Sequence, residues 1–295
     1  MRKNILLTGG SGFIGRNIKE SYLGDKYQIS TPTRDELDCS DDDSVCRYLR
    51  GKSFDVVIHA AAKPGHRNAS DASNIFLMNS RMLFNLLKHQ DYWGKLINMG
   101  SGAIYGMEHY IPKMTESYFG THIPKDEHGY NKYVFGKLLP SLTNVYDFRI
   151  FGIYGKYEDY AIRFISNAIC KALFDLPITL RQNRKFDYLF IDDLMPILEH
   201  FIENDPTEQA FNITPNESID LLSIAEIIRE ISNKDIDIEI GKEGLGLEYS
   251  GDNSLLKNEI SDLKYIDIKD GITDLYYWYL SNQKLLNKTL LLTDH

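Results

Sequence analysis

The residues whose types and spacing point most clearly to chemistry are the glycines of TGGSGFIG at 8–15. They lie between an apolar run at 4–8 and a helical pattern at about 13–23. Glycines at this place permit a tight turn and let a pyrophosphate approach the backbone, while the N–H groups at the start of the helix favour negative charge. The strand–turn–helix context strengthens an otherwise weak signal, and we expect a dinucleotide to bind here. The residues expected to contact it are Gly9, Gly12, Phe13, Ile14 and Gly15.

The loop after the second expected strand (27–31) indicates which dinucleotide binds. It contains no acidic residue before Asp35, and Arg34 lies at the position where an acid selects NAD. A carboxylate there repels a ribose 2′-phosphate, whereas a guanidinium binds it with two hydrogen bonds. Arg34 therefore favours NADP(H), and Arg16 can assist. Asp38 either contacts the adenine amine or caps the helix that follows.

Alternating strands and helices must position these residues. The apolar run at 54–60 has the unbroken pattern of a strand that is covered on both faces. The pattern predicts an α/β fold with a doubly wound parallel sheet. Residues 1–153 are predicted to form the dinucleotide-binding Rossmann domain, with a strand or helix returning from about 185–205. Residues 154–295 are predicted to form mainly a smaller α/β lobe for the substrate. The other expected helices are at 41–49, 75–88, 130–142 and 221–231, and the other expected strands at 95–99, 147–150, 178–180 and 188–191.

The composition limits the class of protein. The 295 residues are 43% hydrophobic, which is enough for a full core, and a net charge of −9 without a long basic run argues against a nucleic-acid partner. The absence of an uncharged apolar run of about 18 residues argues against a membrane span. Cys39, Cys46 and Cys170 lack metal-ligand spacing, so we expect no metal and free thiols in a cytoplasmic protein.

Six motifs in a fixed order carry a resemblance to a known family. They are TGGSGFIG (8–15), HAAAK (59–63), SGAIYG (101–106), RIFGIYG (149–155), KFDYLFIDDL (185–194) and FNITPNESIDLLSIAEII (211–228). Together they resemble the extended short-chain dehydrogenase/reductases that act on nucleotide sugars, the NAD-dependent epimerase/dehydratase family. Within that family the chain is most similar to 4-keto sugar reductases such as GDP-fucose synthase and CDP-abequose synthase. The resemblance implies that the dinucleotide also contacts Ala60, Ala61, Ala62 and Phe151.

The resemblance also implies a catalytic set of serine, tyrosine and lysine. The serine polarises the carbonyl, the tyrosine exchanges the proton, and the lysine holds the ribose. Ser101 and Lys132 match the serine and the lysine, but His128 stands where the family has its tyrosine. His128 and Lys132 are spaced i, i+4 and can share one helix face. An imidazolium can donate a proton near neutral pH, although a nearby lysine lowers the pKa of the histidine.

Other proton donors remain open at this point. Tyr133 and Lys137 also form a YxxxK pattern, but only fifteen residues then separate Lys137 from Gly152, against twenty for Lys132. A further helix turn, a loop and a strand fit more easily into the longer interval. Tyr105, Tyr130 or an impaired site are the remaining alternatives.

The residues around Ser101 narrow the reaction that the resemblance implies. The family's 4,6-dehydratases have Asp-Glu directly after the serine or threonine, whereas this chain has Gly102-Ala103. Ala103 also stands where GDP-fucose synthase has its epimerising cysteine, and 157–163 holds no histidine. We therefore expect NADPH-dependent reduction of a C4 ketone on a GDP-, CDP- or dTDP-activated deoxy sugar or heptose. Candidate substrate residues are Arg163, Arg181 and Arg184 for the diphosphate, and Lys63, His66 and Asn79 near the sugar.

Two rival functions keep the nucleotide-sugar site. One is an NAD-dependent 4-epimerase or dehydrogenase, against which Arg34 argues, and the other is a non-catalytic nucleotide-sugar-binding protein that has lost its tyrosine. The resemblance implies a homodimer formed through helices at about 75–88 and 130–142. It also implies a role in the synthesis of bacterial surface polysaccharides such as a capsule.

Overall fold

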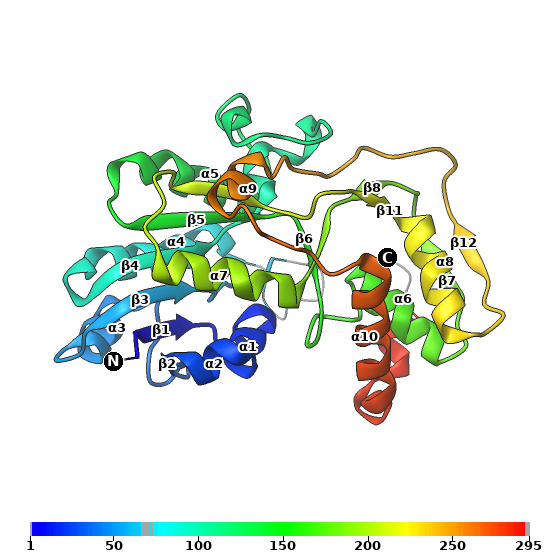
Figure 1. The fold of residues 1–295 in the computed structure, drawn as a ribbon, viewed down its shortest axis with the longest axis horizontal. Coiled ribbons are helices and arrows are strands. Elements are labelled where there is room, and N and C mark those ends of the chain that lie inside the picture. Colours follow the sequence, from blue (N-terminus) through cyan, green and yellow to red (C-terminus); the bar gives the residue numbers. More distant parts are fainter. Residues whose placement is uncertain (1, 66–70, 72, 293–295) are drawn as a thin grey trace.

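A six-stranded parallel sheet and the helices that cover it form the larger part of the molecule (Figure 1). The computed structural model describes residues 2–65, 71 and 73–292. The strand order is β10-β5-β4-β3-β1-β2, and every pair in it is parallel. This arrangement confirms the predicted α/β class with a doubly wound sheet. The strands are β1 (Asn4–Thr8), β2 (Gln28–Ser30), β3 (Phe54–His59), β4 (Trp93–Met99), β5 (Val145–Ile150) and β10 (Ala210–Ile213).

Helices cover both faces of the sheet, because successive strand residues point to opposite sides. Leu7 packs in a core that includes residues of α7 (Leu194–Glu203), with Phe201 against Phe148 at 4.7 Å between ring centroids. Leu6 packs in a second core with residues of the helices on the other face. The strands therefore read as continuous apolar runs. The helices of the second core are α3 (Asp42–Leu49), α4 (Ile75–Lys88) and α5 (Glu127–Leu138).

Three helix boundaries differ from the sequence prediction by three residues or more, and side-chain capping explains two of them. The third is the end of α5, predicted at 142 but found at Leu138, before a 3₁₀ turn that contains Pro140. The helix expected at 13–23 ends at Glu20, because the side chain of Ser21 caps a separate helix, α2 (Tyr22–Lys26), after α1 (Phe13–Glu20). The helix expected at 130–142 begins three residues earlier, because the carboxylate of Asp126 accepts a hydrogen bond from Gly129 N at 2.8 Å. His128 consequently lies in the first turn of α5.

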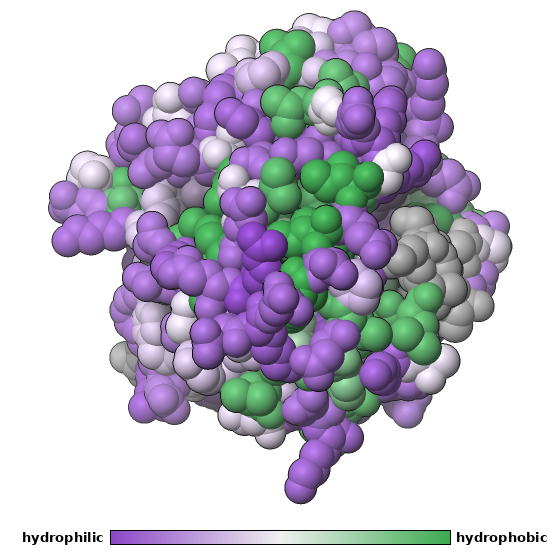
Figure 2. Space-filling model, turned by 90° about the vertical axis from the view of Figure 1, so that its right-hand side faces the viewer, coloured by the Kyte–Doolittle hydropathy of each residue, from purple (hydrophilic) through white to green (hydrophobic). Residues whose placement is uncertain are grey.

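The second lobe has helices around short two-stranded sheets (Figure 1). Figure 2 shows the end of the molecule that carries this lobe, where apolar side chains lie among hydrophilic ones. Its parallel pairs are β6 (Gly152–Tyr154) with β9 (Tyr188–Phe190), and β7 (Ile178–Leu180) with β12 (Ile238–Ile240). β8 (Lys185–Phe186) and β11 (Ile219–Asp220) are antiparallel, and the helices are α6 (Phe164–Leu173), α8 (Leu221–Ser232) and α10 (Ile268–Ser281).

The chain passes between the two parts more than once. α7 and β10 return to the sheet, and the segment after β12 crosses back to α9 (Ser254–Glu259), which contacts β10 (Figure 1). On the way Met114 forms an isolated parallel bridge with Gly251. The division into domains at residue 153 stays a prediction. Within the described part of the chain, none of the helices has the length and apolar character to cross a membrane.

Candidate active site

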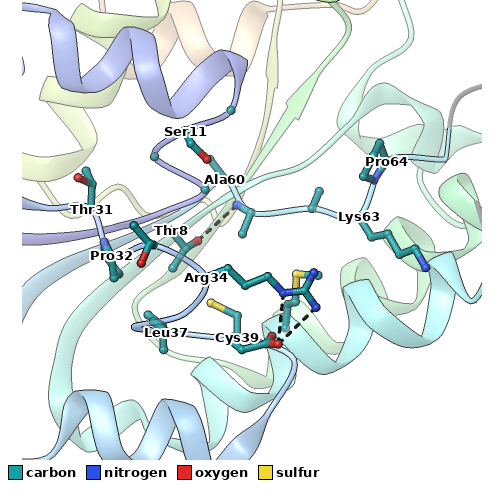
Figure 3. Close-up of a pocket in the computed structure, with 18 of the residues that line it drawn as sticks. Thr8, Ser11, Thr31, Pro32, Arg34, Leu37, Cys39, Ala60, Lys63 and Pro64 are labelled. Carbon is teal, nitrogen blue, oxygen red and sulfur yellow. Dashed lines mark hydrogen bonds and ion pairs between the residues drawn. The ribbon is translucent and has the colours of Figure 1, made fainter. Parts of the chain in front are cut away.

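A cavity of about 1150 Å³ opens at the carboxyl ends of β1, β2 and β3 (Figure 3). Parallel strands bring the loops that follow them to one edge of the sheet, and this is where open α/β sheets bind ligands. The glycine turn, the loop with Arg34 and the loop after β3 therefore face one space. Its lining comprises Thr8, Gly9, Gly10, Ser11, Gly12, Arg16, Lys19, Glu20, Thr31, Pro32, Thr33, Arg34, Leu37, Asp38, Cys39, Ala60, Ala61, Ala62, Lys63, Pro64, Asp71, Asn74, Met78 and Met82.

The glycine turn leaves room for a phosphate group. Gly9 has a φ of +71°, and a Cβ built there would lie 2.6 Å from Ala61 N, so the turn can press against the loop after β3 only as glycine. At Gly12 the nearest atom to such a Cβ is Gly9 O at 3.4 Å. Gly12 is the N-cap of α1 and supplies no side-chain cap, so the first N–H groups of the helix are free to bind an anion. The cavity and this uncapped helix start fit a dinucleotide.

Arg34 extends across the cavity from the loop after β2 (Figure 3). Its Nε and one terminal nitrogen each lie 3.3 Å from Oδ2 of Asp38, and 75% of the side chain is exposed. Burial opposes the negative charge of Asp38, but hydrogen bonds from Ser40 and the charge of Arg34 outweigh it, so the pKa of Asp38 is lowered. Asp41, not Asp38, caps α3, so the capping alternative for Asp38 was wrong. Arg16 also lines the cavity but is paired with Glu20 at 2.9 Å.

The predicted cofactor residues divide into two groups by position. Those that line the cavity are Gly9, Gly12, Arg34, Asp38, Ala60, Ala61 and Ala62. Phe13 and Ile14 pack against the core, and a Cβ on Gly15 would meet Gly9 O at 2.2 Å, so Gly15 holds α1 against the turn. Lys132 lines a smaller neighbouring hollow with Ala60 and Met99. For all of these residues, and for Phe151, contact with a cofactor stays a prediction.

Ser101 and Lys132 both lie at the end of β4. Ser101 directly follows this strand and Gly100, and its Oγ accepts a hydrogen bond from Ala103 N at 3.2 Å. Lys132 Nζ donates to Met99 O at 3.2 Å. Burial lowers the pKa of Lys132, while the carboxylate of Asp147 on β5 opposes the shift. A lysine held at this strand end can reach both a bound ribose and the ketone.

Behind Lys132 lies a buried polar network that the sequence did not reveal. Burial raises the pKa of Asp147, and Arg149 at 3.6 Å and Asn98 at 2.7 Å oppose the shift. A carboxylate this deep is retained only with such partners. The network supplies a negative charge that helps keep Lys132 protonated.

His128 lies on the same helix as Lys132, one turn before it, and its role as proton donor stays a prediction. Desolvation by the surrounding protein, followed by the charge of Lys132, lowers the pKa of His128 to about 4, although the side chain keeps an exposed surface. Arg163, at the start of α6 in the second lobe, adds to the shift. The first turn of a helix also disfavours a cation. At pH 7 His128 is therefore a neutral imidazole that can still donate one hydrogen bond.

The alternative tyrosines have other surroundings. Tyr133 packs against Phe119 at 5.3 Å between centroids, and Lys137 Nζ lies 5.3 Å from the Tyr133 ring. Tyr105 is buried, and its hydroxyl donates to Asn212 Oδ1 at 2.6 Å. Tyr130 is 43% exposed and stacks on Phe76 of α4.

Tyr249 is a site residue that sequence analysis missed. Its hydroxyl oxygen would lie 2.7 Å from a Cβ built on Gly102, the residue after Ser101, and its ring lies against Phe151 with centroids 4.9 Å apart. It stands in a glycine-rich loop far along the chain from Ser101. Because only the tertiary fold brings that loop to β4, no local pattern could have revealed it.

Two of the candidate substrate residues, Arg163 and Arg184, lie near Tyr188 on β9. Arg163 and Arg184 are both close enough for their charges to act on Tyr188, and Arg184 Nε is buried without a hydrogen-bond partner among the described residues. Arg181 is exposed. Asn79 holds the loop after β3, since its Oδ1 accepts from Lys63 N at 2.6 Å.

The two remaining candidate substrate residues are Lys63 and His66. Lys63 Nζ pairs with Asp71 at 2.6 Å. His66 lies outside the described residues.

A buried carboxyl, Glu158, was also missed by sequence analysis. Burial raises the pKa of Glu158 to about 8, and Ser166 Oγ donates a hydrogen bond to it at 2.6 Å.

A family model agrees with this geometry. The model of the NAD dependent epimerase/dehydratase family matches residues 5–214, which include the glycine turn, Ser101 and Lys132. The chain belongs to this family. Membership means that it is an NAD(P)-dependent type of protein that modifies nucleotide sugars, as the sequence resemblance predicted.

Individual relatives of this epimerase/dehydratase family member are distant. An uncharacterized protein of Methanocaldococcus jannaschii is 22% identical over 96% of this chain and 98% of its own length. The GDP-L-fucose synthase of Azorhizobium caulinodans is 33% identical, but the match covers 35% of this chain and about a third (34%) of that enzyme. Among solved structures, the GDP-mannoheptose C4 reductase of Campylobacter jejuni with NADP bound has a TM-score of 0.81 and 17% identity, over 95% of this chain and 98% of that one. Similarity at this level shows the shared fold.

Proposed function

We propose that this protein reduces the C4 ketone of a nucleotide-activated deoxy sugar or heptose with NADPH. When bound, the reduced cofactor supplies a hydride to the ketone carbon. Ser101 hydrogen-bonds the ketone oxygen, and Lys132 holds the ribose and stabilises negative charge as it develops on that oxygen. The observation that carries the proposal is that Ser101 and Lys132 both lie at the end of β4, where Lys132 bonds Met99 O and lines a hollow next to the dinucleotide cavity.

The absence of an acid after Ser101 favours reduction over water loss. Gly102 and Ala103 begin the short helix there, and both are buried. A dehydratase needs an acid and a base on neighbouring sugar carbons, and neither residue can serve. Arg163 and Arg184 supply positive charge for the diphosphate of the substrate, because a guanidinium binds phosphate oxygens in pairs. The nucleoside diphosphate that carries the sugar is GDP, CDP or dTDP.

NADP(H) is the proposed cofactor because Arg34, in the loop after β2 where an acid would select NAD, lines the dinucleotide cavity. Arg34 must give up, or share, its ion pair with Asp38 to bind the ribose 2′-phosphate. Such an exposed pair is worth only ~0.2–1 kcal/mol, so a dianionic phosphate can displace it.

His128, the proton donor suggested by the sequence, fits a different part of the reaction better. A neutral imidazole with a pKa near 4 releases little proton at pH 7 but donates a hydrogen bond to a sugar hydroxyl or phosphate. We assign it to substrate binding, with proton donation as the alternative that mutagenesis separates.

The proposed setting is a cytoplasmic homodimer that serves the synthesis of a bacterial capsule or related polysaccharide. α4 and α5 pack together and leave Leu77, Phe84 and Tyr130 exposed, which supports pairing of this face in a second copy.

Single-turnover oxidation of NADPH with 4-keto sugar nucleotides tests the function. Wild-type protein should oxidise one equivalent, and Ser101→Ala should lower the rate by at least tenfold. Ser141→Ala is a matched control, since this exposed serine, within the described part of the chain, donates its side-chain hydrogen bond to Leu138 O at the end of α5. Tightly held NAD with interconversion of 4-hydroxyl epimers would instead identify an epimerase, and binding without turnover would identify a binding protein.

A further inference from the structure

Tyr249 brings a phenol hydroxyl from the second lobe to the strand end that carries Ser101. A Cβ built on Gly102, the residue after Ser101, would lie 2.7 Å from the Tyr249 hydroxyl oxygen. The Tyr249 ring lies beside that of Tyr110, with centroids 4.7 Å apart, so the hydroxyl is held at the residue next to Ser101. A hydroxyl next to the group that holds the ketone oxygen is where a proton must be delivered in the reduction.

The backbone around Tyr249 is fixed from both sides. Tyr249 N donates to Lys185 O at 2.9 Å, and Asp187 N donates to Tyr249 O at 3.1 Å. On the other side Met114 N donates to Ser250 O at 3.1 Å. The segment thus lies as an extra strand between β8 and the loop at 113–115, and a side chain on it is held in place rather than mobile.

A buried carboxylate locks this segment further. Asp187 Oδ2 accepts from Gly251 N at 2.8 Å and from Thr214 Oγ1 at 2.5 Å, and Lys113 Nζ lies 3.5 Å from Oδ1. A shift of the segment would take the Gly251 N–H away from this buried carboxylate, so that hydrogen bond opposes the shift. The position of the Tyr249 hydroxyl is therefore built into the fold.

We propose that Tyr249 is the proton donor in the ketone reduction and takes the place of the tyrosine that His128 replaces in α5. The inference rests on the proposed function. As C4 accepts the hydride, the carbonyl π electrons move to the oxygen, the Tyr249 O–H bond breaks, and a new O–H bond forms on the sugar. The phenolate then regains a proton from water, which returns the site to its starting state.

The charges that face Tyr249 suit this role. Burial raises its pKa to about 12, and the charge of Asp187 acts in the same direction, while hydrogen bonds with Ser101 and Tyr110 and the charge of Arg163 oppose the shift. The hydroxyl is protonated at neutral pH, and an alkoxide is a stronger base than a phenolate. The reduction rate should therefore stay level from about pH 6 to 9, whereas an imidazolium donor with a pKa near 4 would lose rate about tenfold per pH unit over that range.

Replacing each candidate hydroxyl or imidazole separates the donors. Tyr249→Phe should lower the single-turnover rate at least about 100-fold, leave NADPH affinity within twofold, and keep the Tm. Tyr160→Phe is the matched control, because the hydroxyl of this half-buried tyrosine of the same lobe accepts a hydrogen bond from Asn287 N, its one hydrogen-bond partner among residues 2–65, 71 and 73–292. His128→Gln should weaken substrate binding more than it slows hydride transfer. A Tyr249→Phe protein as fast as wild type, or a wild-type rate that falls steadily above pH 6, would overturn the assignment.

A readout without substrate keeps the inference separate from the proposed function. In protein labelled with 3-fluorotyrosine, the fluorine resonance that Tyr249→Phe removes should shift when Ser101→Ala is introduced, and the resonance of Tyr160 should not. An unmoved Tyr249 resonance places the hydroxyl away from Ser101 and overturns the inference. Failure of wild-type protein to reduce any 4-keto sugar nucleotide, with the shift present, refutes the proposed function instead.

Discussion

Replacing Arg34 by alanine should weaken NADPH binding and leave NADH binding unchanged. A charge-assisted hydrogen bond contributes about 1.5–3 kcal/mol, and Arg34 must first give up an exposed ion pair with Asp38 at 3.3 Å that is worth ~0.2–1 kcal/mol. The net loss is therefore about 1–2 kcal/mol, or roughly a 5- to 30-fold higher Kd, since about 1.4 kcal/mol is a factor of ten.

Fluorescence titration with both nucleotides measures the effect in one experiment. Asp38→Asn is the paired variant: it frees Arg34 and removes a negative charge near the phosphate, so NADPH should bind up to about fivefold more tightly. Glu36→Gln is a control, because Glu36 bonds Thr33 and makes no contact with Arg34. If Arg34→Ala weakens NADH and NADPH equally, or neither, the assignment of Arg34 to the 2′-phosphate is refuted.

Three other variants test separate parts of the account. Gly9→Ala should destabilise the fold by about 1–3 kcal/mol, because a Cβ there would lie 2.6 Å from backbone and φ is +71°. Gly12→Ala should lower the free energy of unfolding by less than ~1 kcal/mol but should weaken cofactor binding. Equal losses of stability for the two variants in denaturant unfolding would contradict this. Lys132→Met should raise the Kd for NADPH at least about tenfold by fluorescence titration, through loss of a charge-assisted bond, and an unchanged Kd would remove Lys132 from the ribose. Glu158 has a raised pKa of about 8, so the unfolded chain loses this proton at lower pH than the folded one, and stability falls as pH rises from about 4.5 to 8. Glu158→Gln should keep the Ser166 contact and flatten this fall in Tm, and an identical pH dependence in both proteins would show that Glu158 ionises normally.

The cofactor half of the molecule was readable from the sequence because its signals are local. The turn at 8–15 needs glycine where the φ of Gly9 is positive and where a Cβ on Gly15 would strike the turn, so the residue types themselves report the conformation. The strand at 54–60 reported its burial on both faces through its unbroken apolar run. These elements were predicted within a few residues, and the family model confirms the resemblance.

The helix boundaries and the proton-donor side of the site were harder to predict from the sequence. The start of α5 was placed too late because the cap at Asp126 competes with other polar residues in a loop of mixed composition. The low pKa of His128 comes mainly from burial and then from the charge of Lys132, with a smaller part from Arg163, which only the tertiary fold brings near. Tyr249 is fixed by strand-like contacts with residues far away in the chain. Such contacts are tertiary, and periodicity or spacing cannot express them.

The most direct test of the central claim is to follow the label of deuterated NADPH into the product. Wild-type protein with a 4-keto sugar nucleotide should consume one NADPH per sugar and place one deuterium on C4, as read by NMR of the product. Interconversion of sugar epimers without net consumption of NADPH, or no transfer of deuterium to C4 of any 4-keto sugar nucleotide, would contradict the claim that this chain is a C4 ketone reductase.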